Sequence, residues 1–522
     1  MTPRVTGATV VRDRDAERSS VGSLHEAIAS PPSFASELSV PSSTRRTHYW
    51  VTFAVLAVSV ASYTLMQSLT IPVLSEIEAE MDTDQNTVTW VLTAYLLSAS
   101  VFTPIVGRLG DAYGKQRMLV LSLAALSVGS LLAALAPTIG VLILARVLQG
   151  VGGGVLPLAF GIIRDEFPHH KVGSAVSVVS SLLAVGFGAG IVLAGPISSG
   201  LGYHWLFWLP FIVTAVMAVL AIVVVPESPV RTPGRIAIVP AFLLSAWLVC
   251  LLLALSQAPD WGWGSPKVIG LVVAAIVLVV AWVRTELHVE VPLIDMKMMR
   301  LPGVWTTNLV ALLLGVGMYA SFGFIPQFNQ TPTSNGYGFG ATITESGLLM
   351  LPSAITTFLT GLVADRIAQR IGAKTVVVTG SVIGAVGMFM LAFFHDEKWQ
   401  VAVANGVVGT GIGLAFACLA GLIVAAVTPE QTGVASGMNA NIRTIGGSVG
   451  TAVMASIVTA HFLPSGFPKE IGYTAGFIVL GGALVAAALA GLAIPGLSPQ
   501  ELEDRLEMDP VSVAEDLEPA SR

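Results

Sequence analysis

Long apolar runs separated by short polar segments dominate the chain from about residue 48 onward. Most are roughly 20 residues long, the length of α-helix that crosses about 30 Å of hydrocarbon. Their apolar character is continuous rather than alternating, which excludes a membrane β-barrel. We predict an all-α polytopic membrane protein with fourteen membrane-spanning helices, near residues 50–74, 87–107, 118–137, 139–160, 172–197, 203–226, 236–257, 266–284, 302–327, 345–364, 374–394, 399–427, 433–462 and 473–495.

Composition narrows the class of protein further. Hydrophobic residues make up 54% of the 522 residues and charged residues 11%, against about 25% charged residues in an ordinary globular protein. This leaves too little polar surface for a soluble enzyme, and a net charge of −6 provides no basic field for nucleic acid. Both cysteines lie in apolar runs, the eight histidines lack metal-ligand spacing, and no Walker motif occurs. We expect no enzymatic activity, no cofactor and no metal.

The two ends of the chain differ from the apolar body. Residues 1–47 include a Ser-, Pro- and Ala-rich stretch that cannot bury enough apolar surface to fold, and we interpret them as a disordered tail. No charged n-region and apolar segment follow Met1, so we do not expect a cleaved signal peptide. Residues 497–522 are predicted to form an acidic tail.

Basic residues predict the orientation in the membrane. If the N-terminus is inside, most loop arginines and lysines lie on the inner side, whereas the outer side carries Lys267, Lys398 and Lys469. The positive-inside rule then places both termini in the cytoplasm, which requires an even number of spans. We expect a multi-pass protein of the plasma membrane, in contact with the lipid bilayer and monomeric, because nothing in the sequence requires a larger assembly.

The chain also contains an internal repeat. The segment Gly-Arg-Leu-Gly-Asp at 107–111 recurs as Gly-Leu-Val-Ala-Asp at 361–365, an offset of 254 residues. Glycines at 186, 188 and 190 match Gly446, Ser448 and Gly450 at an offset of 260. Repeated halves with a binding site between them are typical of secondary transporters. We predict two six-helix halves, 48–228 and 291–496, joined by two extra membrane helices in 229–290.

One loop, residues 107–117, combines glycines with charge in the sequence Gly-Arg-Leu-Gly-Asp-Ala-Tyr-Gly-Lys-Gln-Arg. Glycines permit a tight turn, and a carboxylate beside basic residues and helix ends pairs in one conformation and is released in another. A plain positive-inside loop does not predict an acid at the matching place in both halves. We interpret the loop and its counterpart as a gate formed by Gly107, Asp111, Gly114, Lys115, Arg117, Gly361, Asp365 and Arg366.

This loop resembles the signature loop of the major facilitator superfamily. The segment Thr-Trp-Val-Leu-Thr-Ala-Tyr-Leu-Leu at 89–97 is similar to the second helix of its fourteen-helix drug:proton antiporter branch. Residues 145–152, Ala-Arg-Val-Leu-Gln-Gly-Val-Gly, resemble the buried-arginine motif. Residues 190–200 resemble the export motif, with Ser199 where Gly is usual. The resemblance covers about residues 50–495 and implies the major facilitator fold and export driven by a proton gradient.

The first helix departs from this branch. It reads Met-Gln-Ser-Leu-Thr-Ile-Pro at 66–72, without the acidic residue that many members carry there, and no predicted span has a carboxylate at its middle. The proton-binding residue is therefore in doubt. Arg146, Glu345 and Asp111 are the remaining candidates for coupling or gating.

Arg146 and Arg443 are the ionisable residues predicted well inside spans. Such residues are costly in the membrane and indicate function by default, although backbone carbonyls of a neighbouring helix satisfy some structural arginines. Both alternatives stay open here. Other polar residues line the predicted cavity or form interhelical hydrogen bonds. The cavity candidates are Gln67, Gln149, Asn308, Gln327, Asn439 and Arg443.

Glycine clusters in three helices resemble nucleotide-binding loops, but no strand precedes them and no Lys-Ser/Thr follows. We interpret them as surfaces for close helix packing. In the predicted fifth helix, a proline removes one backbone donor and favours a bend. The residues of this export-motif helix are Gly186, Gly190, Gly195 and Pro196.

These observations predict a secondary active transporter that exports small hydrophobic or amphipathic compounds, such as drugs and antibiotics, by alternating access in exchange for protons. The missing acid in the first helix favours an alternative, uptake or uncoupled facilitated exchange of a small organic solute. A non-transporting membrane sensor, with the Ser-rich tail as its output, is the alternative from another class.

Overall fold

The computed structural model describes residues 49–83, 85–228, 238–289 and 292–495. The predicted tails, 1–47 and 497–522, and the first residues of the predicted linker region, 229–237, lie outside these ranges. Every named element in the described ranges is a helix, and each of the fourteen predicted runs overlaps one long helix, except the fourth, which covers two consecutive helices. The all-α prediction is confirmed.

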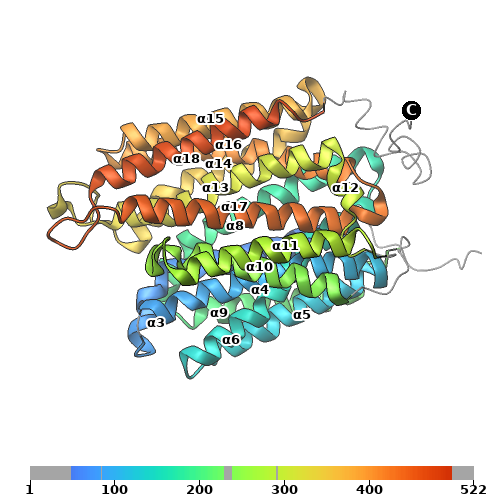
Figure 1. The fold of residues 1–522 in the computed structure, drawn as a ribbon, viewed down its shortest axis with the longest axis horizontal. Helices are drawn as coiled ribbons and strands as arrows, with labels where there is room; N and C mark the ends of the chain where they lie inside the picture. Colours follow the sequence, from blue (N-terminus) through green and yellow to red (C-terminus); the bar gives the residue numbers. More distant parts are fainter. Residues whose placement is uncertain (1–48, 84, 229–237, 290–291, 496–522) are drawn as a thin grey trace, which may run out of the picture. The chain divides into compact units, whose positions relative to one another are not determined.

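The helices of the first group run from Tyr49 to Val224 (Figure 1). The short helices η1 (Ile71–Val73) and α3 (Leu74–Glu80) follow the first of them. The fourth predicted span consists of α6 and α7, joined by the 3-10 turn η2 (Val151–Gly154) over three consecutive glycines. The long helices are α2 (Tyr49–Leu69), α4 (Gln85–Tyr113), α5 (Lys115–Ala134), α6 (Ile139–Gly150), α7 (Val155–Glu166), α8 (His169–Leu201) and α9 (Trp205–Val224).

Two further helices precede the second group. These are α10 (Ile238–Trp261) and α11 (Pro266–Glu286), which pack against each other, and α10 also contacts α4 and α17 (Figure 1). The short α12 (Met296–Arg300) follows. The second group comprises α13 (Pro302–Gln330), α14 (Ile343–Ile371), α15 (Ala373–Phe393), α16 (Lys398–Ala425), α17 (Thr432–Val458) and α18 (Glu470–Gly491).

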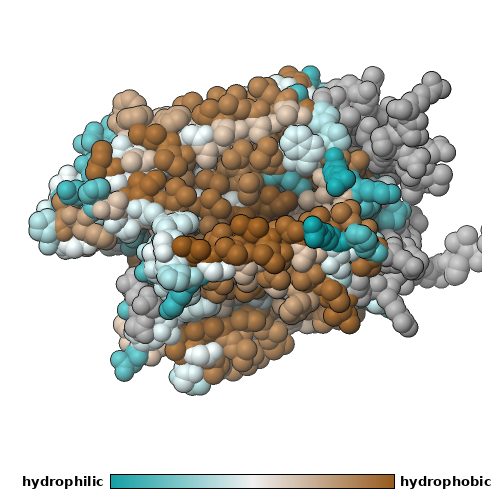
Figure 2. Space-filling view, viewed as in Figure 1, coloured by the Kyte–Doolittle hydropathy of each residue, from teal (hydrophilic) through white to brown (hydrophobic). Residues whose placement is uncertain are grey.

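Thirteen helices in the described ranges are long and apolar enough to cross a membrane. The remaining predicted span is α17, whose 27 residues exceed the length needed but include Asn439, Asn441 and Arg443. These polar side chains lower the mean hydropathy of α17, and Asn439 and Asn441 are buried, which keeps them away from lipid. The outer surface differs from this interior. Figure 2 shows a broad apolar surface across the middle of the visible face, with hydrophilic residues gathered near its ends.

Small residues bring corresponding helix pairs of the two groups together. In α8, a Cβ on Gly186 would lie 2.0 Å from Thr64 Oγ1 of α2, and one on Gly190 would lie 2.6 Å from the Leu65 carbonyl oxygen. In α17, a Cβ on Gly446 or Gly450 would lie 2.0 or 2.2 Å from a backbone oxygen of α13. Close backbone approach is the usual reason for small residues between membrane helices. The fifth helix of each group thus packs on the first.

The two groups contact each other through α8 with α14 and α16, and through α17 with α4 and α7. The α8–α14 pair approaches closely at several levels. A Cβ on Gly361 would overlap the Ser181 side chain, and one on Gly347 would lie 2.9 Å from the Val192 Cα. A Cβ on Gly195 would lie 2.7 Å from Thr344 Oγ1, and α8 continues through Pro196 to Leu201.

Candidate functional site

The contact at the end of α4 joins the two groups. Asp111 is 2% exposed, and its Oδ2 accepts a hydrogen bond of 3.2 Å from the Val434 backbone amide. Val434 lies in the first turn of α17, where amides lack partners within the helix and the helix dipole is positive. A carboxylate is stabilised at such a position. We call this hydrogen bond the Asp111 contact.

Two glycines provide the space for the Asp111 contact. A Cβ on Gly433 would lie 2.8 Å from both Asp111 carboxylate oxygens and 2.9 Å from the Gly107 carbonyl oxygen. A Cβ on Gly107 would lie 2.7 Å from the Gly433 carbonyl oxygen. Both residues sit in helices, so the requirement is close approach and not an unusual backbone angle.

Buried charges surround the Asp111 contact. The Lys115 ammonium is 2.7 Å from Asp165 Oδ2 and 4.0 Å from Asp111 Oδ1, and all three side chains are about 1% exposed. Arg117 is exposed and its Nε lies 3.5 Å from Glu227 Oε2. Lys115 therefore holds two carboxylates in place, whereas the Arg117 pair is screened by solvent and contributes little.

Gly114 makes the turn between α4 and α5. Its φ of 117° lies in a region that L side chains rarely adopt, and a Cβ there would lie 2.6 Å from Glu227 Oε1. Both the backbone angle and the neighbouring carboxylate require glycine at this position.

Arg164 makes a second bridge at this end of the bundle. Its Nη1 donates hydrogen bonds to the Val424 and Val427 carbonyl oxygens and to Thr432 Oγ1, at 2.6 to 2.9 Å. It joins α7 to the end of α16 and the start of α17. Hydrogen bonds from a charged donor are stronger than neutral ones.

The repeated acid lies at the corresponding place on the other side. Asp365 of α14 lies beside the first turns of α8, where a Cβ on Gly173 would be 3.0 Å from Asp365 Oδ1. Gln369 donates a hydrogen bond of 3.2 Å to Asp365 Oδ2. Arg366 is exposed. Each acid of the repeat therefore lies near the N-terminal end of the fifth helix of the other group.

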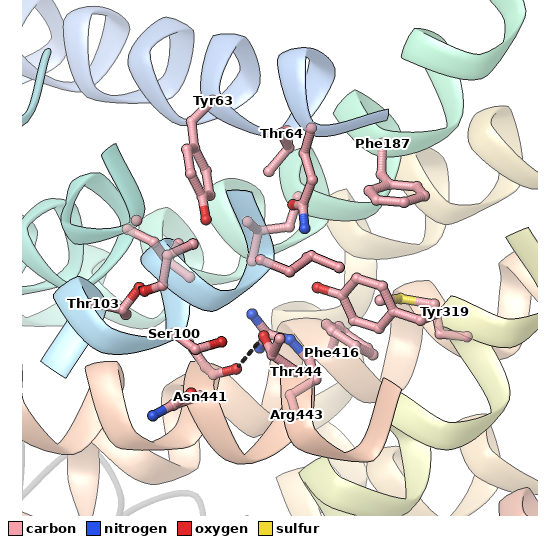
Figure 3. Close-up of a pocket in the computed structure, with 18 residues that line it drawn as sticks. Tyr63, Thr64, Ser100, Thr103, Phe187, Tyr319, Phe416, Asn441, Arg443 and Thr444 are labelled. Carbon is pink, nitrogen blue, oxygen red and sulfur yellow. Dashed lines mark hydrogen bonds between the residues drawn. The ribbon is translucent and has the colours of Figure 1, made fainter. Parts of the chain in front are cut away.

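A central cavity is lined by residues of α2, α4, η2, α7, α8, α13, α16 and α17 (Figure 3). Four aromatic residues contribute to its wall, and one of them, Phe187, packs edge-on against Tyr319 at 5.6 Å and is tilted against Phe322, behind the wall, at 4.9 Å. Hydroxyl and amide groups are spread between the rings. The lining residues include Tyr63, Thr64, Gln67, Ser100, Thr103, Phe187, Tyr319, Phe416, Asn441, Arg443 and Thr444.

Arg146 lies behind this cavity and is fully buried. Its Nε donates to the Val91 carbonyl oxygen at 2.9 Å, and its Nη1 donates to Gln149 Oε1 at 2.8 Å. Gln149 in turn donates to Ser130 Oγ at 3.0 Å. These hydrogen bonds join α4, α5 and α6.

Aromatic rings separate Arg146 from the cavity. The Arg146 Cζ lies 4.3 Å from the centre of the Tyr95 ring, and Tyr95 lies 6.4 Å from the Tyr63 ring, which lines the cavity. Neither Arg146 nor Gln149 contributes to the cavity wall. Tyr95 and Tyr63 therefore form one line of contact between Arg146 and the cavity.

The other candidates from the sequence occupy different places. Gln67 lines the cavity. Asn439 donates a hydrogen bond of 2.9 Å to Asn308 Oδ1, which joins α17 to α13. Gln327 is exposed near the end of α13 and is not among the lining residues. Glu345 is exposed, and its carboxylate accepts the Thr342 amide in a capping box at the start of α14.

Sequence reasoning missed several residues at the Asp111 end of the bundle. From the sequence, Arg164 belongs with the other basic residues predicted on the inner side, and Asp165, Glu227 and Gly433 are not among the predicted site residues. Asp165 could have been identified from the sequence, because it follows an arginine at the end of an apolar run. In the structure it pairs with Lys115 of the signature loop. Glu227 and Gly433 have no comparable signal, since their partners are distant in sequence.

Comparison with known proteins identifies the family. The model of the Major Facilitator Superfamily matches residues 56–451 and 309–512, which is more than half of the chain. The chain belongs to the major facilitator superfamily. The family inferred from the signature loop is confirmed, and with it the major facilitator fold.

Relatives with established names span most of the chain. The multidrug efflux pump LfrA of Mycolicibacterium smegmatis is 30% identical over 463 residues, covering 86% of this chain and 90% of LfrA. A multidrug resistance protein B homolog of Mycobacterium tuberculosis is 29% identical over 74% of this chain and 71% of its own length. The multidrug transporter MdtP of Bacillus subtilis is 27% identical over 72% and 69%, respectively.

A solved structure shows the same fold at low sequence identity. The human organic anion transporter MFSD10 (TETRAN) is 13% identical and superposes with a TM-score of 0.60 over 85% of this chain and 99% of its own. At this identity the likeness concerns the arrangement of helices alone. The comparison therefore supports the fold, and any binding preference has to be inferred from the residues of this chain.

Proposed function

We propose that this superfamily member is a secondary active transporter that exports small hydrophobic or amphipathic compounds, including drugs and antibiotics, in exchange for protons. The observation that carries the proposal is a cavity of mixed aromatic, aliphatic and polar lining between two groups of helices that are bridged at one end by the Asp111 contact. The names of LfrA, the protein B homolog and MdtP support export of drugs.

In this proposal the two six-helix groups, 48–228 and 291–496, rock against each other, with 229–290 as an accessory pair. The Asp111 contact and the Arg164 hydrogen bonds hold one end together in one state and break in the other. The charge on Asp111 and the dipole of α17 provide the differential stabilisation that such a switch requires. No covalent chemistry takes part, and the chain acts as a monomer.

We place the protein in the plasma membrane with both termini in the cytoplasm, so that the Asp111 end faces the cytoplasm. The proton gradient drives export. No carboxylate lines the cavity among the described residues, so the proton site lies elsewhere. Asp111 is our first candidate for coupling, because it is buried and contacts the other group of helices. Arg146, through Tyr95, is the second. Glu345 is the weakest, because it caps a helix and is exposed.

Drug accumulation in a pump-deficient host tests the proposal. Cells expressing the chain should accumulate less of a lipophilic dye than cells with an empty vector, and a protonophore should remove the difference. They should also survive higher concentrations of several unrelated antibiotics. Dye accumulation equal to that of the empty vector, at confirmed membrane abundance of the protein, would contradict export.

The same assay distinguishes the other candidate functions. The described residues of the cavity wall include no carboxylate, which favours uncoupled exchange as the second candidate. Flux that is unchanged by a protonophore would support it. A membrane sensor predicts that deleting residues 1–45 removes the phenotype, whereas a transporter keeps its flux.

A further inference from the structure

The charge of the central cavity is positive. Among the described residues that line it, Arg443 is the single side chain with a formal charge, and it points into the cavity from α17 (Figure 3). The remaining lining residues are aromatic, aliphatic, hydroxyl or amide side chains. The cavity thus has a cation and no anion to balance it.

Arg443 differs from the other arginines inside the helices. Arg146 donates to two acceptors, and Arg164 donates to three. None of these three arginines has an ion pair within the described residues, and Arg146 also leaves its buried Nη2 without an acceptor. The difference lies at Nε, which donates to the Val91 carbonyl oxygen in Arg146 but is buried without a hydrogen-bond acceptor among the described residues in Arg443. Its Cζ lies 5.1 Å from the centre of the Phe416 ring, which is a weak substitute for a carboxylate.

Other polar groups beside Arg443 also lack partners. Asn441 is 2% exposed, and both its amide nitrogen and its carbonyl oxygen are buried without hydrogen bonds in the described part of the chain. The buried Ser100 hydroxyl lacks a partner as well. Both residues line the same cavity. Unsatisfied buried polar groups are costly, and at a binding site they are satisfied by the ligand.

An organic anion fits this arrangement. A guanidinium binds a carboxylate through two parallel hydrogen bonds, and the interaction is strong where water is excluded. The Asn441 amide and the Ser100 hydroxyl are further donors for oxygen. The rings of Phe187, Tyr319 and Phe416 provide surface for a flat apolar body.

We propose that the compounds carried by this protein include amphipathic organic anions, with a carboxylate or phenolate paired to Arg443 and an aromatic body against the cavity wall. This inference rests on the proposed function, since it takes the cavity as the site at which exported compounds bind. It adds a charge preference that a purely hydrophobic cavity would lack.

Calorimetric titration of the purified full-length protein with three matched probes tests the inference. The probes are naphthaleneacetate, naphthaleneethanol and naphthaleneethylamine, which share an aromatic body and differ in charge. We expect the anion to bind about tenfold more tightly than the alcohol, and the cation to bind most weakly. Equal affinities, tighter binding of the amine, or no binding of any probe would overturn the inference.

Variants of Arg443 provide the second arm. Arg443→Gln should weaken binding of naphthaleneacetate about tenfold and leave naphthaleneethanol unchanged, and Arg443→Lys should retain part of the preference. Arg300→Gln, an exposed site in α12, removes the same charge outside the cavity and should change nothing. Equal weakening of all three probes by Arg443→Gln would indicate a structural role and contradict the inference.

If Arg443→Gln does not fold, the comparison of the three probes on the natural protein still tests the anion preference. Failure of this inference and failure of the proposed function give different results. Dye export without an anion preference would overturn the inference and leave export standing. An anion preference without gradient-dependent export would support the inference and contradict the proposed function.

Discussion

The carboxylate of Asp111 accepts the backbone amide of Val434, 323 residues further along the chain, at 3.2 Å. This hydrogen bond ends at the first turn of α17 and therefore joins an acid to a helix dipole. It links the loop with the strongest sequence signature to the helix that carries Arg443.

Removing the charge of Asp111 should impair transport without preventing folding. Asp111→Asn keeps the shape of the side chain but loses the charge–dipole attraction, which contributes about 1 kcal/mol. Dye export in the pump-deficient host should fall severalfold while membrane abundance stays near that of the natural protein. The exposed Asp260→Asn is the matched control and should export normally. Unchanged export by Asp111→Asn would show that the contact has no gating role.

A methyl group at Gly433 should disrupt the Asp111 contact sterically. Its Cβ would lie 2.8 Å from both carboxylate oxygens, so α4 and α17 must separate or Asp111 must turn away. We expect Gly433→Ala to reduce dye export at least as much as Asp111→Asn. Gly421→Ala in α16 is the control, because a Cβ there meets nothing within 4 Å. If both variants export alike, the close approach at Gly433 does not matter for transport.

The helix interface between α8 and α2 should be sensitive to size. In Gly190→Ala the new Cβ would lie 2.0 Å from Ser68 Oγ and 2.6 Å from a backbone oxygen, so the helices must move apart. Overpacking of this kind costs about 1–3 kcal/mol, which thermal unfolding of the purified protein detects as a lower melting temperature. Gly200→Ala lies in the same helix, meets nothing within 4 Å, and should unfold like the natural protein. Equal melting temperatures for the two variants would contradict the packing.

Gln149 should stabilise the buried guanidinium of Arg146. Gln149→Leu removes the acceptor of Arg146 Nη1 and the donor to Ser130 Oγ. Leaving a buried charged donor without its partner costs about 1–3 kcal/mol, so we expect a lower melting temperature. Gln149→Glu retains an acceptor and should be less destabilised than Gln149→Leu. An unchanged melting temperature in Gln149→Leu would mean that Arg146 finds another acceptor.

Much of the fold follows from the sequence, because the bilayer fixes both helix length and polarity. All fourteen predicted runs lie in helices, since an apolar run of this length has few alternatives in lipid. The packing of Gly186 and Gly190 was also readable from small residues at helical spacing. The helices that pack against α17 could not be predicted from the sequence. Its polar residues line a cavity or bind a neighbouring helix, and neither partner is visible in the sequence of α17 itself.

The candidate site was less accessible from sequence. Asp111 stood out through its loop, but the amide that it binds belongs to Val434, and a backbone donor leaves no mark in the sequence. Glu345 illustrates the opposite problem. The pattern Thr342-x-x-Glu345 is a capping box, a local signal that was available and that explains the acid structurally.

Proton-coupled export is measured most directly as proton release from energised vesicles on addition of a substrate. Everted membrane vesicles that contain the protein are energised until their interior is acid, and candidate compounds are then added while a fluorescent dye reports the pH difference. We expect exported compounds to collapse part of the gradient in vesicles with the natural protein, and much less of it in vesicles with Asp111→Asn. A broad panel of hydrophobic and amphipathic compounds that leaves the gradient intact would contradict proton-driven export.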